Sequence, residues 1–264
     1  MDFLKRDLAP LSAEAWEEID TRAVEVLRTH LTARRAVHVK GPLGWERNVV
    51  GEGRLTVLEE PKGGVHTGIY KVRPLVETRA NFDLDRWEMD DITRGARDPD
   101  LDSLEDAMKK MALFEERTIY KGYEKGCIEG LLSSSEQEPI SFGTNHESIM
   151  DAVSKAALTL RETFQEGPFT LLAGVTAWTR LHDQSPGYPL PRRVADLIGG
   201  KILYSAALEN ALLIPHEHED LELTIGGDFS IGYVSHDSKK IRLFAAESFT
   251  FRVVDPSLVV PFEV

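Results

Sequence analysis

RLTVLEEPKGGVHTGIYKV, residues 54–72, predicts a long β-hairpin. Two strand-like runs, 54–58 and 67–72, flank a connection that carries Pro61, Gly63 and Gly64. The apolar positions of this stretch are sparse, and an isolated hairpin is only marginally stable in water. We therefore expect the arm, residues 49–77, to lie on another surface, either the rest of this chain or a neighbouring subunit.

The residues on either side of the arm predict a mixed α and β protein. Apolar residues recur at helical spacing in several segments, which predicts helices over residues 13–31, 103–123, 147–164, 176–181 and 192–198. Short apolar or alternating runs predict strands at 37–39, 169–173, 201–204, 211–214, 221–225, 230–234, 241–246, 250–254 and 259–262. Because helices and strands do not alternate regularly, we expect an α+β fold rather than a doubly wound sheet.

Composition excludes several classes of protein. The chain has 264 residues with 31 basic and 44 acidic side chains, a formal net charge of −13, which argues against nucleic-acid binding. No apolar run approaches the ~18 residues of a membrane span, and the N-terminal residues lack the apolar core of a signal peptide. We expect a cytoplasmic protein with neither nucleic acid nor membrane as partner. A single cysteine, Cys127, excludes an internal disulfide and a multi-cysteine zinc site.

The familiar catalytic motifs are missing from the sequence. His146 and Glu147 resemble the start of a zinc-protease helix, but Met150 occupies the position of the second histidine. There is no nucleophile elbow and no phosphate-binding loop. Cys127 is interpreted as a small core residue rather than a nucleophile. We expect no catalytic residue in this chain, which is the profile of an assembly protein.

The segment HEHED, residues 216–220, leaves a second interpretation open. If it were a strand, His216 and His218 would point to one face and Glu219 could complete a metal site, as in a metal-dependent enzyme. The alternative is a polar turn that joins strands 211–214 and 221–225 in a hairpin. The turn is favoured, so no metal is expected.

Seven stretches spread along the chain carry a resemblance to a known family. They are LKRDLAPL (4–11), GPLGWE (41–46), FDLDRWEMDDITRGAR (82–97), residues 100–116, GYPLPRRV (187–194), DFSIGY (228–233) and RLFAAESFTFRV (242–253). In order and spacing they resemble the encapsulins, bacterial shell proteins with the fold of tailed-phage major capsid proteins. A prophage major capsid protein is the alternative within this fold.

The resemblance implies both an architecture and an assembly. It implies a peripheral domain of residues 1–48, 78–132 and 228–252, an extended loop of residues 49–77, and an axial domain of residues 133–227 and 253–264. The implied partner is further copies of the chain, most simply about sixty, in a closed icosahedral shell.

The resemblance also implies a function. Encapsulin shells enclose a cargo enzyme, a ferritin-like iron oxidase or a dye-decolorising peroxidase, through its C-terminal targeting peptide, and serve iron storage or oxidative-stress defence. The positions that match the peptide site are Leu27, Arg34, His38, Ser230, Ile231 and Gly232. Leu27 and Ile231 would anchor apolar side chains, and Arg34 would pair with a carboxylate or carbonyl.

Two further sites follow from the resemblance alone. The loop 183–189 is similar to the loop at the fivefold axis, so a pore would be lined by Asp183, Ser185, Pro186, Gly187 and Tyr188. A ring of Asp183 carboxylates would attract cations such as ferrous iron, unless Asp183 merely ends the preceding helix. Some relatives bind a flavin at the position of Trp87, which is otherwise interpreted as a half-buried interface residue. No other cofactor is expected.

Overall fold

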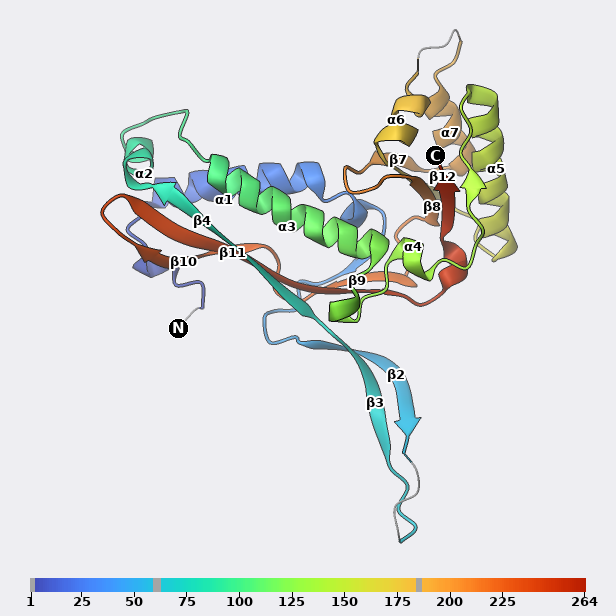
Figure 1. Cartoon of the computed structure of the whole chain (residues 1–264), viewed down its shortest axis with the longest axis horizontal. Helices are drawn as coiled ribbons and strands as arrows, with labels where there is room; N and C mark the ends of the chain where they lie inside the picture. Colours follow the sequence, from blue (N-terminus) through green and yellow to red (C-terminus); the bar gives the residue numbers. More distant parts are fainter. Residues whose placement is uncertain (1–2, 59–62, 184–186) are drawn as a thin grey trace.

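The computed structural model of the chain describes residues 3–58, 63–183 and 187–264 (Figure 1). Two five-stranded sheets, each carrying helices, lie next to each other, and a two-stranded arm projects away from both. This is the mixed architecture that the sequence predicts.

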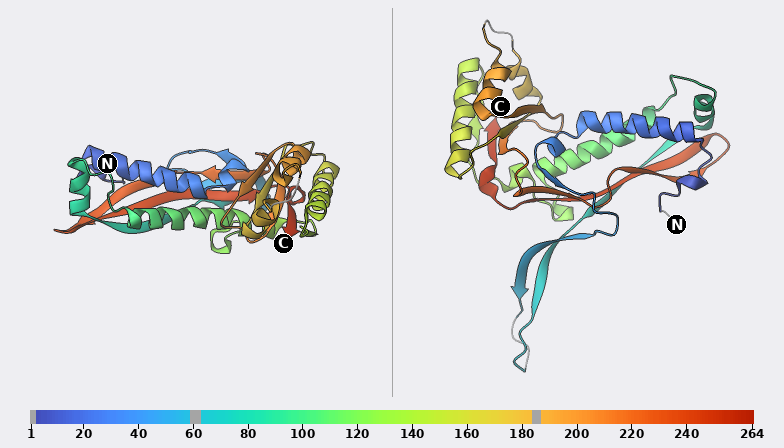
Figure 2. Two further views of the ribbon diagram at one scale, coloured as in Figure 1. Left: turned by 90° about the horizontal axis from the view of Figure 1, so that it is seen from above. Right: turned by 180° about the vertical axis from the view of Figure 1, so that it is seen from behind.

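The first sheet has the order β1-β9-β11-β10, with β4 also paired to β11. Its strands are β1 (His38–Lys40), β4 (Val76–Asp85), β9 (Leu221–Ile225), β10 (Ser230–His236) and β11 (Lys240–Val253). Helices α1 (Ala13–His30) and α3 (Asp102–Lys121) cover one of its faces, side by side in both views of Figure 2. The short helix α2 (Arg86–Thr93) continues directly from β4.

The second sheet has the order β5-β12-β8-β6-β7. Its strands are β5 (Ile140–Ser141), β6 (Phe169–Ala173), β7 (Lys201–Tyr204), β8 (Ala211–Pro215) and β12 (Val260–Glu263). The helices around it are α4 (Leu131–Ser134), α5 (His146–Glu162), α6 (Val175–Leu181) and α7 (Leu190–Ile198). The arm consists of β2 (Val49–Val57) and β3 (Gly68–Pro74), and four 3₁₀ turns complete the described elements: η1 (Arg6–Leu8), η2 (Ala33–Arg35), η3 (Glu124–Gly126) and η4 (Pro256–Leu258).

The longer helices begin and end where local chemistry requires. At the start of α1 the Ser12 hydroxyl accepts a hydrogen bond from the Ala15 N–H. At the start of α5 the Asn145 side-chain oxygen accepts one from the Ser148 N–H. Helix α7 ends at Gly199, whose φ of 63° favours glycine. Helices therefore start and stop within two residues of the sequence prediction wherever a cap or a glycine marks the boundary.

Three apolar clusters hold the elements together. The first packs α1 and α3 on the first sheet, and the second packs α5 and α7 on the second sheet. The third lies at the junction, where Leu172 and Leu212 of the second sheet meet Leu223 and Phe249 of the first, with Ile119 of α3. The two sheets therefore share one continuous buried contact.

The structure corrects three predictions of local structure. Residues 241–246 and 250–254 form one strand, β11, because Glu247 and Ser248, which appeared to separate two strands, are buried within it. The predicted hairpin between 211–214 and 221–225 does not form, since β8 and β9 belong to different sheets. Strand β4 and helix α2 were not predicted, because their polar residues conceal the apolar alternation of Phe82 and Leu84.

Gly200, which lies between α7 and β7, is close to the main chain of β6, and this gives a first testable prediction. A Cβ atom at Gly200 would overlap the main-chain oxygen of Phe169, whereas a Cβ atom at Gly51 would have nothing within 4 Å. Gly200→Ala should lower the free energy of unfolding by about 1–3 kcal/mol, and Gly51→Ala should leave it nearly unchanged. Denaturant unfolding of the two variants checks this, and an equal loss in both would contradict it.

Candidate functional site

Arg34 lies at the centre of a charge cluster that joins four segments of the chain. From η2 it donates two hydrogen bonds to Glu115 of α3, from Nε at 2.9 Å and from a terminal nitrogen at 2.6 Å. It also donates to Asp228 at 2.9 Å and to Glu247 of β11. The side chains of Glu115 and Glu247 are 0% and 1% exposed. Arg34 is therefore fully engaged within its own chain.

Three carboxylates surround this single guanidinium, so the cluster has an excess of negative charge. Burial lowers the pKa of Arg34, but the hydrogen bonds and charges of its three partners outweigh this, raise the pKa, and keep the side chain protonated. Burial, together with Glu115, raises the pKa of Glu247 well above its usual value. One oxygen of Glu247 has no hydrogen-bond partner in the described parts of the chain. The buried cluster therefore contains more carboxyl groups than cations to pair with them.

Glu116, the residue after Glu115 on α3, also contacts η2, but through the Ala33 main chain rather than through the Arg34 side chain. Its carboxyl accepts hydrogen bonds from the Ala33 N–H at 2.6 Å, the Ser205 hydroxyl at 2.8 Å and the Tyr120 hydroxyl at 3.0 Å. Burial raises the pKa of Glu116 to about 7, although the hydrogen bonds from Ala33 and Ser205 lower it. Consecutive glutamates thus hold consecutive residues of η2. We call Ala33, Arg34, Glu115 and Glu116 the α3–η2 clasp.

The structure brings together part of the sequence-predicted peptide site. Leu27 of α1 and Ile231 of β10 belong to the same apolar cluster, and Arg34 lies 5.0 Å over the ring of Phe229. Ile231 and Gly232 are buried, whereas Leu27 and Ser230 are partly exposed.

His38 lies apart from these residues along the sheet. It is on β1, at the other end of the strand order from β10, and it pairs with Glu222 of β9.

Sequence reasoning did not identify the carboxylates of this region. Asp228, Glu115 and Glu247 contact Arg34, and only Asp228 is substantially exposed. The sequence pattern alone indicates that Glu115 and Glu116 are buried, because they lie on the same side of α3 as the apolar residues Met111 and Ile119. A charged pair on the buried face of a helix indicates buried partners.

The arm presents an apolar surface that no other described part of the chain covers. Leu55 lies opposite Tyr70 in the register, so their side chains share one face, and Val57 and Val72 lie two positions away on that face. The side chains of Leu55, Val57 and Tyr70 are 52%, 75% and 72% exposed. We call these four residues the arm's apolar face. The arm's apolar face is thus a contiguous exposed patch, although Ile69, which pairs with Thr56, is an exposed apolar residue on the opposite face.

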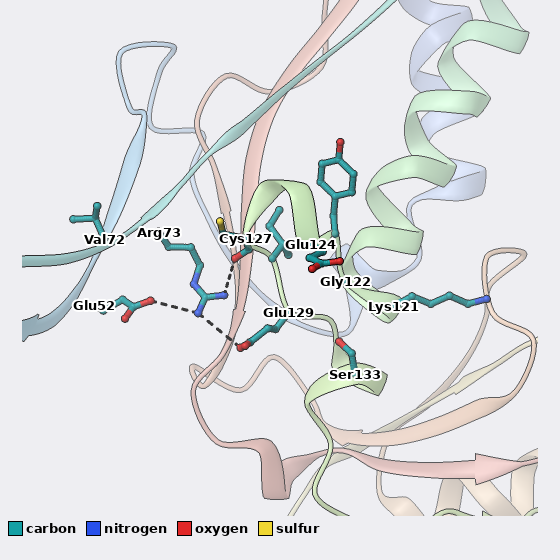
Figure 3. A pocket seen from close by; sticks show the side chains of 11 residues that line it. Glu52, Val72, Arg73, Lys121, Gly122, Glu124, Cys127, Glu129 and Ser133 are labelled. Atoms are coloured by element: carbon teal, nitrogen blue, oxygen red, sulfur yellow. Dashed lines mark hydrogen bonds and ion pairs between the residues drawn. The ribbon is translucent and has the colours of Figure 1, made fainter. Parts of the chain in front are cut away.

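A single arginine anchors the base of the arm to the body (Figure 3). Arg73 of β3 donates hydrogen bonds to Glu52 of β2 at 3.4 Å and to the Cys127 main-chain oxygen at 3.3 Å, and lies 3.9 Å from Glu129. These residues border an open cavity of about 650 Å³ at the end of α3. Cys127 is exposed, so its interpretation as a core residue is wrong. Its position at the C-terminal end of η3, with a φ of 55°, leaves the thiol on this surface.

The other sequence-predicted sites lie apart from this region. His216 and His218 lie between the two sheets rather than in a hairpin, and His216 bonds to the Thr170 hydroxyl at 2.9 Å. Across residues 3–58, 63–183 and 187–264, no three His, Cys, Asp or Glu side chains are grouped to hold a metal ion. The described residues therefore offer no cluster of ligands for the alternative of a metal-dependent enzyme.

Helices α6 and α7, which flank the predicted pore loop in sequence, lie at the opposite end of the molecule from the arm (Figure 1). Asp183, Gly187 and Tyr188 are exposed there, and Ser185 and Pro186 lie outside the described residues.

Trp87 occupies the first turn of α2 and is 69% exposed in the single chain, with Arg94 5.8 Å from the centre of its ring. The ring offers a stacking face, but Glu88, Asp90 and Asp91 on the same helix would oppose the phosphate of a flavin nucleotide. A flavin here would require ligands from outside this chain.

Comparison with known proteins identifies the family to which this chain belongs. The profile of the family described as "encapsulating protein for peroxidase" matches residues 1–250. The chain belongs to the encapsulin family. It is 37% identical to the type 1 encapsulin shell protein of Rhodospirillum rubrum, over 99% of this chain and 96% of the relative. The corresponding protein of Mycobacterium tuberculosis is 35% identical over 95% of each chain.

Solved structures support the encapsulin fold. The virus-like particle protein of Pyrococcus furiosus superposes with a TM-score of 0.72 at 14% identity, covering 95% of this chain and all of that one. The capsid of Myoviridae phage XM1 gives 0.55 at 10% identity, over 88% of this chain and 92% of that one. The fold is therefore that of tailed-phage capsid proteins, which confirms the predicted fold class. Among the described residues, no helix has the length and apolar character needed to cross a membrane.

The clasp gives a prediction for this encapsulin. Arg34→Met would leave Glu115 and Glu247 buried without a cation, so we expect the free energy of unfolding to fall by about 3–5 kcal/mol at pH 7. The loss should be smaller at about pH 5, because the pKa of Glu247 is raised and the neutral form of that carboxyl is favoured as the pH falls. Chemical denaturation at the two pH values measures it.

The matched control is Arg22→Met, because Arg22 pairs with Glu105 and Glu25 on the surface. Exposed pairs contribute about 0–1 kcal/mol, so this variant should remain close to the unmodified protein. Equal effects of the two substitutions would show that the Arg34 cluster is not the stabilising contact.

Proposed function

We propose that this chain is the subunit of a closed icosahedral shell that encloses a cargo enzyme through that enzyme's C-terminal targeting peptide. The observation that carries the proposal is the arm, whose apolar face has no partner within the described chain. The relatives named above are shell proteins, and the fold is shared with capsid subunits. In this proposal the subunit has no catalytic role of its own.

Burial of the arm against a second copy supplies the physical reason for assembly. Burying a Leu or Val side chain stabilises by about 1.5–3 kcal/mol, and the arm's apolar face has four large side chains to bury. Arg73 ties the base of the arm to the body, and β2 and β3 project away from it, in position to reach a neighbour (Figure 1). Because each subunit gives and receives one arm, the contact is heterologous and closes only around symmetry axes.

We predict that the double substitution Leu55→Glu and Tyr70→Glu prevents shell closure. Two carboxylates on the arm's apolar face would be desolvated in the contact without a partner. The purified variant should elute as a small species, where the unmodified chain elutes at the megadalton scale and forms closed particles in electron micrographs.

The control uses the other face of the same arm. Thr56 lies between Leu55 and Val57 in sequence and therefore points to the opposite side. Thr56→Glu should assemble normally. Closed particles from the double variant would refute the role of the arm's apolar face.

The cargo peptide is proposed to bind beside α1 and β10. Leu27, with the exposed Val24 one turn before it, and Ser230 are the accessible groups there, while Ile231 and Gly232 form the floor beneath them. Arg34 is occupied by its three carboxylates, so it would orient the site rather than bind the peptide directly. The site therefore suits a short peptide with an apolar anchor.

The cargo that this shell would hold is a ferritin-like iron oxidase or a dye-decolorising peroxidase in the cytoplasm, which serves iron storage or oxidative-stress defence. Asp183 and Tyr188 would line the pore, and a ring of Asp183 carboxylates would concentrate cations at its mouth. In this proposal small ions cross the shell and macromolecules do not.

We predict that Leu27→Glu removes cargo from shells that still assemble. The substitution places a carboxylate in the apolar part of the site, which opposes binding of an apolar anchor by several kcal/mol, or about 100-fold or more in affinity. Cargo content of purified shells, measured as the ratio of cargo to shell protein, checks the outcome.

Thr29→Glu is the control, since Thr29 is exposed and lies on the opposite side of α1 from Leu27. It adds the same charge to the same helix and should load normally. Unchanged loading in Leu27→Glu would place the peptide elsewhere.

A further inference from the structure

The carboxyl of Glu116 lies where the two sheets meet. On one side it accepts a hydrogen bond from the Ala33 N–H of η2, which leads into the first sheet. On the other it accepts one from Ser205, the residue that follows β7 of the second sheet. Beside it, the Thr32 hydroxyl donates to the Tyr204 main-chain oxygen at 2.8 Å. Glu116 therefore connects both sheets to α3 through one buried group.

The surroundings of Glu116 offer it hydroxyl and amide donors but no cation of its own. Glu115 and Tyr120 of α3 are the titratable groups that act on Glu116. Beyond them, Arg34 of η2 and Glu247 of β11 act on Glu115, and Arg35 of η2 acts on Tyr120. Arg34 is engaged by three other carboxylates, and Arg35 is an exposed residue whose guanidinium contacts Thr32. From the second sheet the polar contact is the neutral Ser205 hydroxyl.

The remaining neighbours are apolar. The junction cluster places Ala33, Ile119, Ala207 and Leu208 around the same point, all of them buried. An ionised carboxylate here is stabilised only by three hydrogen-bond donors, whereas a neutral carboxyl can also donate to a hydroxyl oxygen. A low-dielectric site of this kind favours the neutral form.

We propose that Glu116 is a proton-operated lock between the two sheets: the protonated carboxyl holds them together, and its ionisation loosens the junction. In the proposed shell a loosened junction would change how neighbouring subunits meet, so the lock would make the contacts between subunits depend on pH. This goes beyond the proposed shell function, and the lock itself can be tested on unassembled subunits.

The direction of the pH dependence follows from proton linkage. Burial raises the pKa of Glu116 from 4.5 to about 7 in the closed junction, and opening returns it to its ordinary value. Between these values the closed form binds a proton that the open form lacks, so opening becomes more favourable as pH rises. The opening constant should increase by up to about tenfold per pH unit, and level off above about pH 7.

The test compares the purified full chain with Glu116→Gln, which mimics the protonated side chain. Hydrogen exchange of the amides around residues 32–36 and 203–208, corrected for intrinsic rates, reports opening from about pH 5 to pH 8. We expect the opening of the unmodified chain to rise through this range and that of Glu116→Gln to stay flat. Glu209→Gln, an exposed carboxyl on the same loop paired with Lys121, should follow the unmodified chain. A slope in Glu116→Gln equal to that of the unmodified chain would overturn the proposal.

A second measurement needs no folded variant at position 116. Infrared spectroscopy of the unmodified chain should show a carboxylic-acid C=O band that disappears with a midpoint near pH 7, and the response of this band to Ser205→Ala distinguishes Glu116 from the buried Glu247. Ser205→Ala removes one hydroxyl partner of Glu116 and should shift the frequency of that band. Absence of such a band near neutral pH, or a band that Ser205→Ala does not move, would refute the lock.

Discussion

Two consecutive glutamates on α3 hold two consecutive residues of η2, and the remaining structure depends on this contact. Glu115 holds the Arg34 side chain and Glu116 holds the Ala33 main chain. Since η2 joins α1 to β1, the clasp fixes where α1 ends and where the first sheet begins. Its four residues also connect to β11 through Glu247 and to the second sheet through Ser205. A buried charge cluster is a weak source of net stability, but removing one member is costly, so it specifies one arrangement.

Outside this central contact, the most prominent uncovered surface among the described residues is the arm's apolar face. The arm extends away from the body with its apolar face exposed and only its base anchored, through Arg73. Helices α6 and α7 lie at the opposite end of the molecule (Figure 1). An arm with an uncovered apolar face suits assembly with further copies of the chain, in keeping with the shell proteins to which it is similar.

Local signals in the sequence predicted most elements, and the failures share one cause. Strand β6 was predicted with its observed bounds because five consecutive residues are buried between neighbouring strands. Strand β11 was divided at Glu247 and Ser248 because polar residues usually end a buried run. Glu247 is tolerated there only because Arg34, more than 200 positions earlier, is its partner. The exposed Cys127 was misplaced for the same reason, since its accessibility depends on how η3 meets the arm.

Sequence alone determined the fold class, the family, the arm and the absence of familiar catalytic motifs. These follow from periodicity, composition and quoted motifs, each of which is encoded over short distances along the chain. Tertiary structure alone decided that Arg34 is occupied by three carboxylates, that Ile231 is buried, and that Glu116 bridges two sheets. The partners of these side chains lie far away in sequence, and burial and charge depend on all of them together. Such contacts leave no local pattern that sequence reasoning can detect.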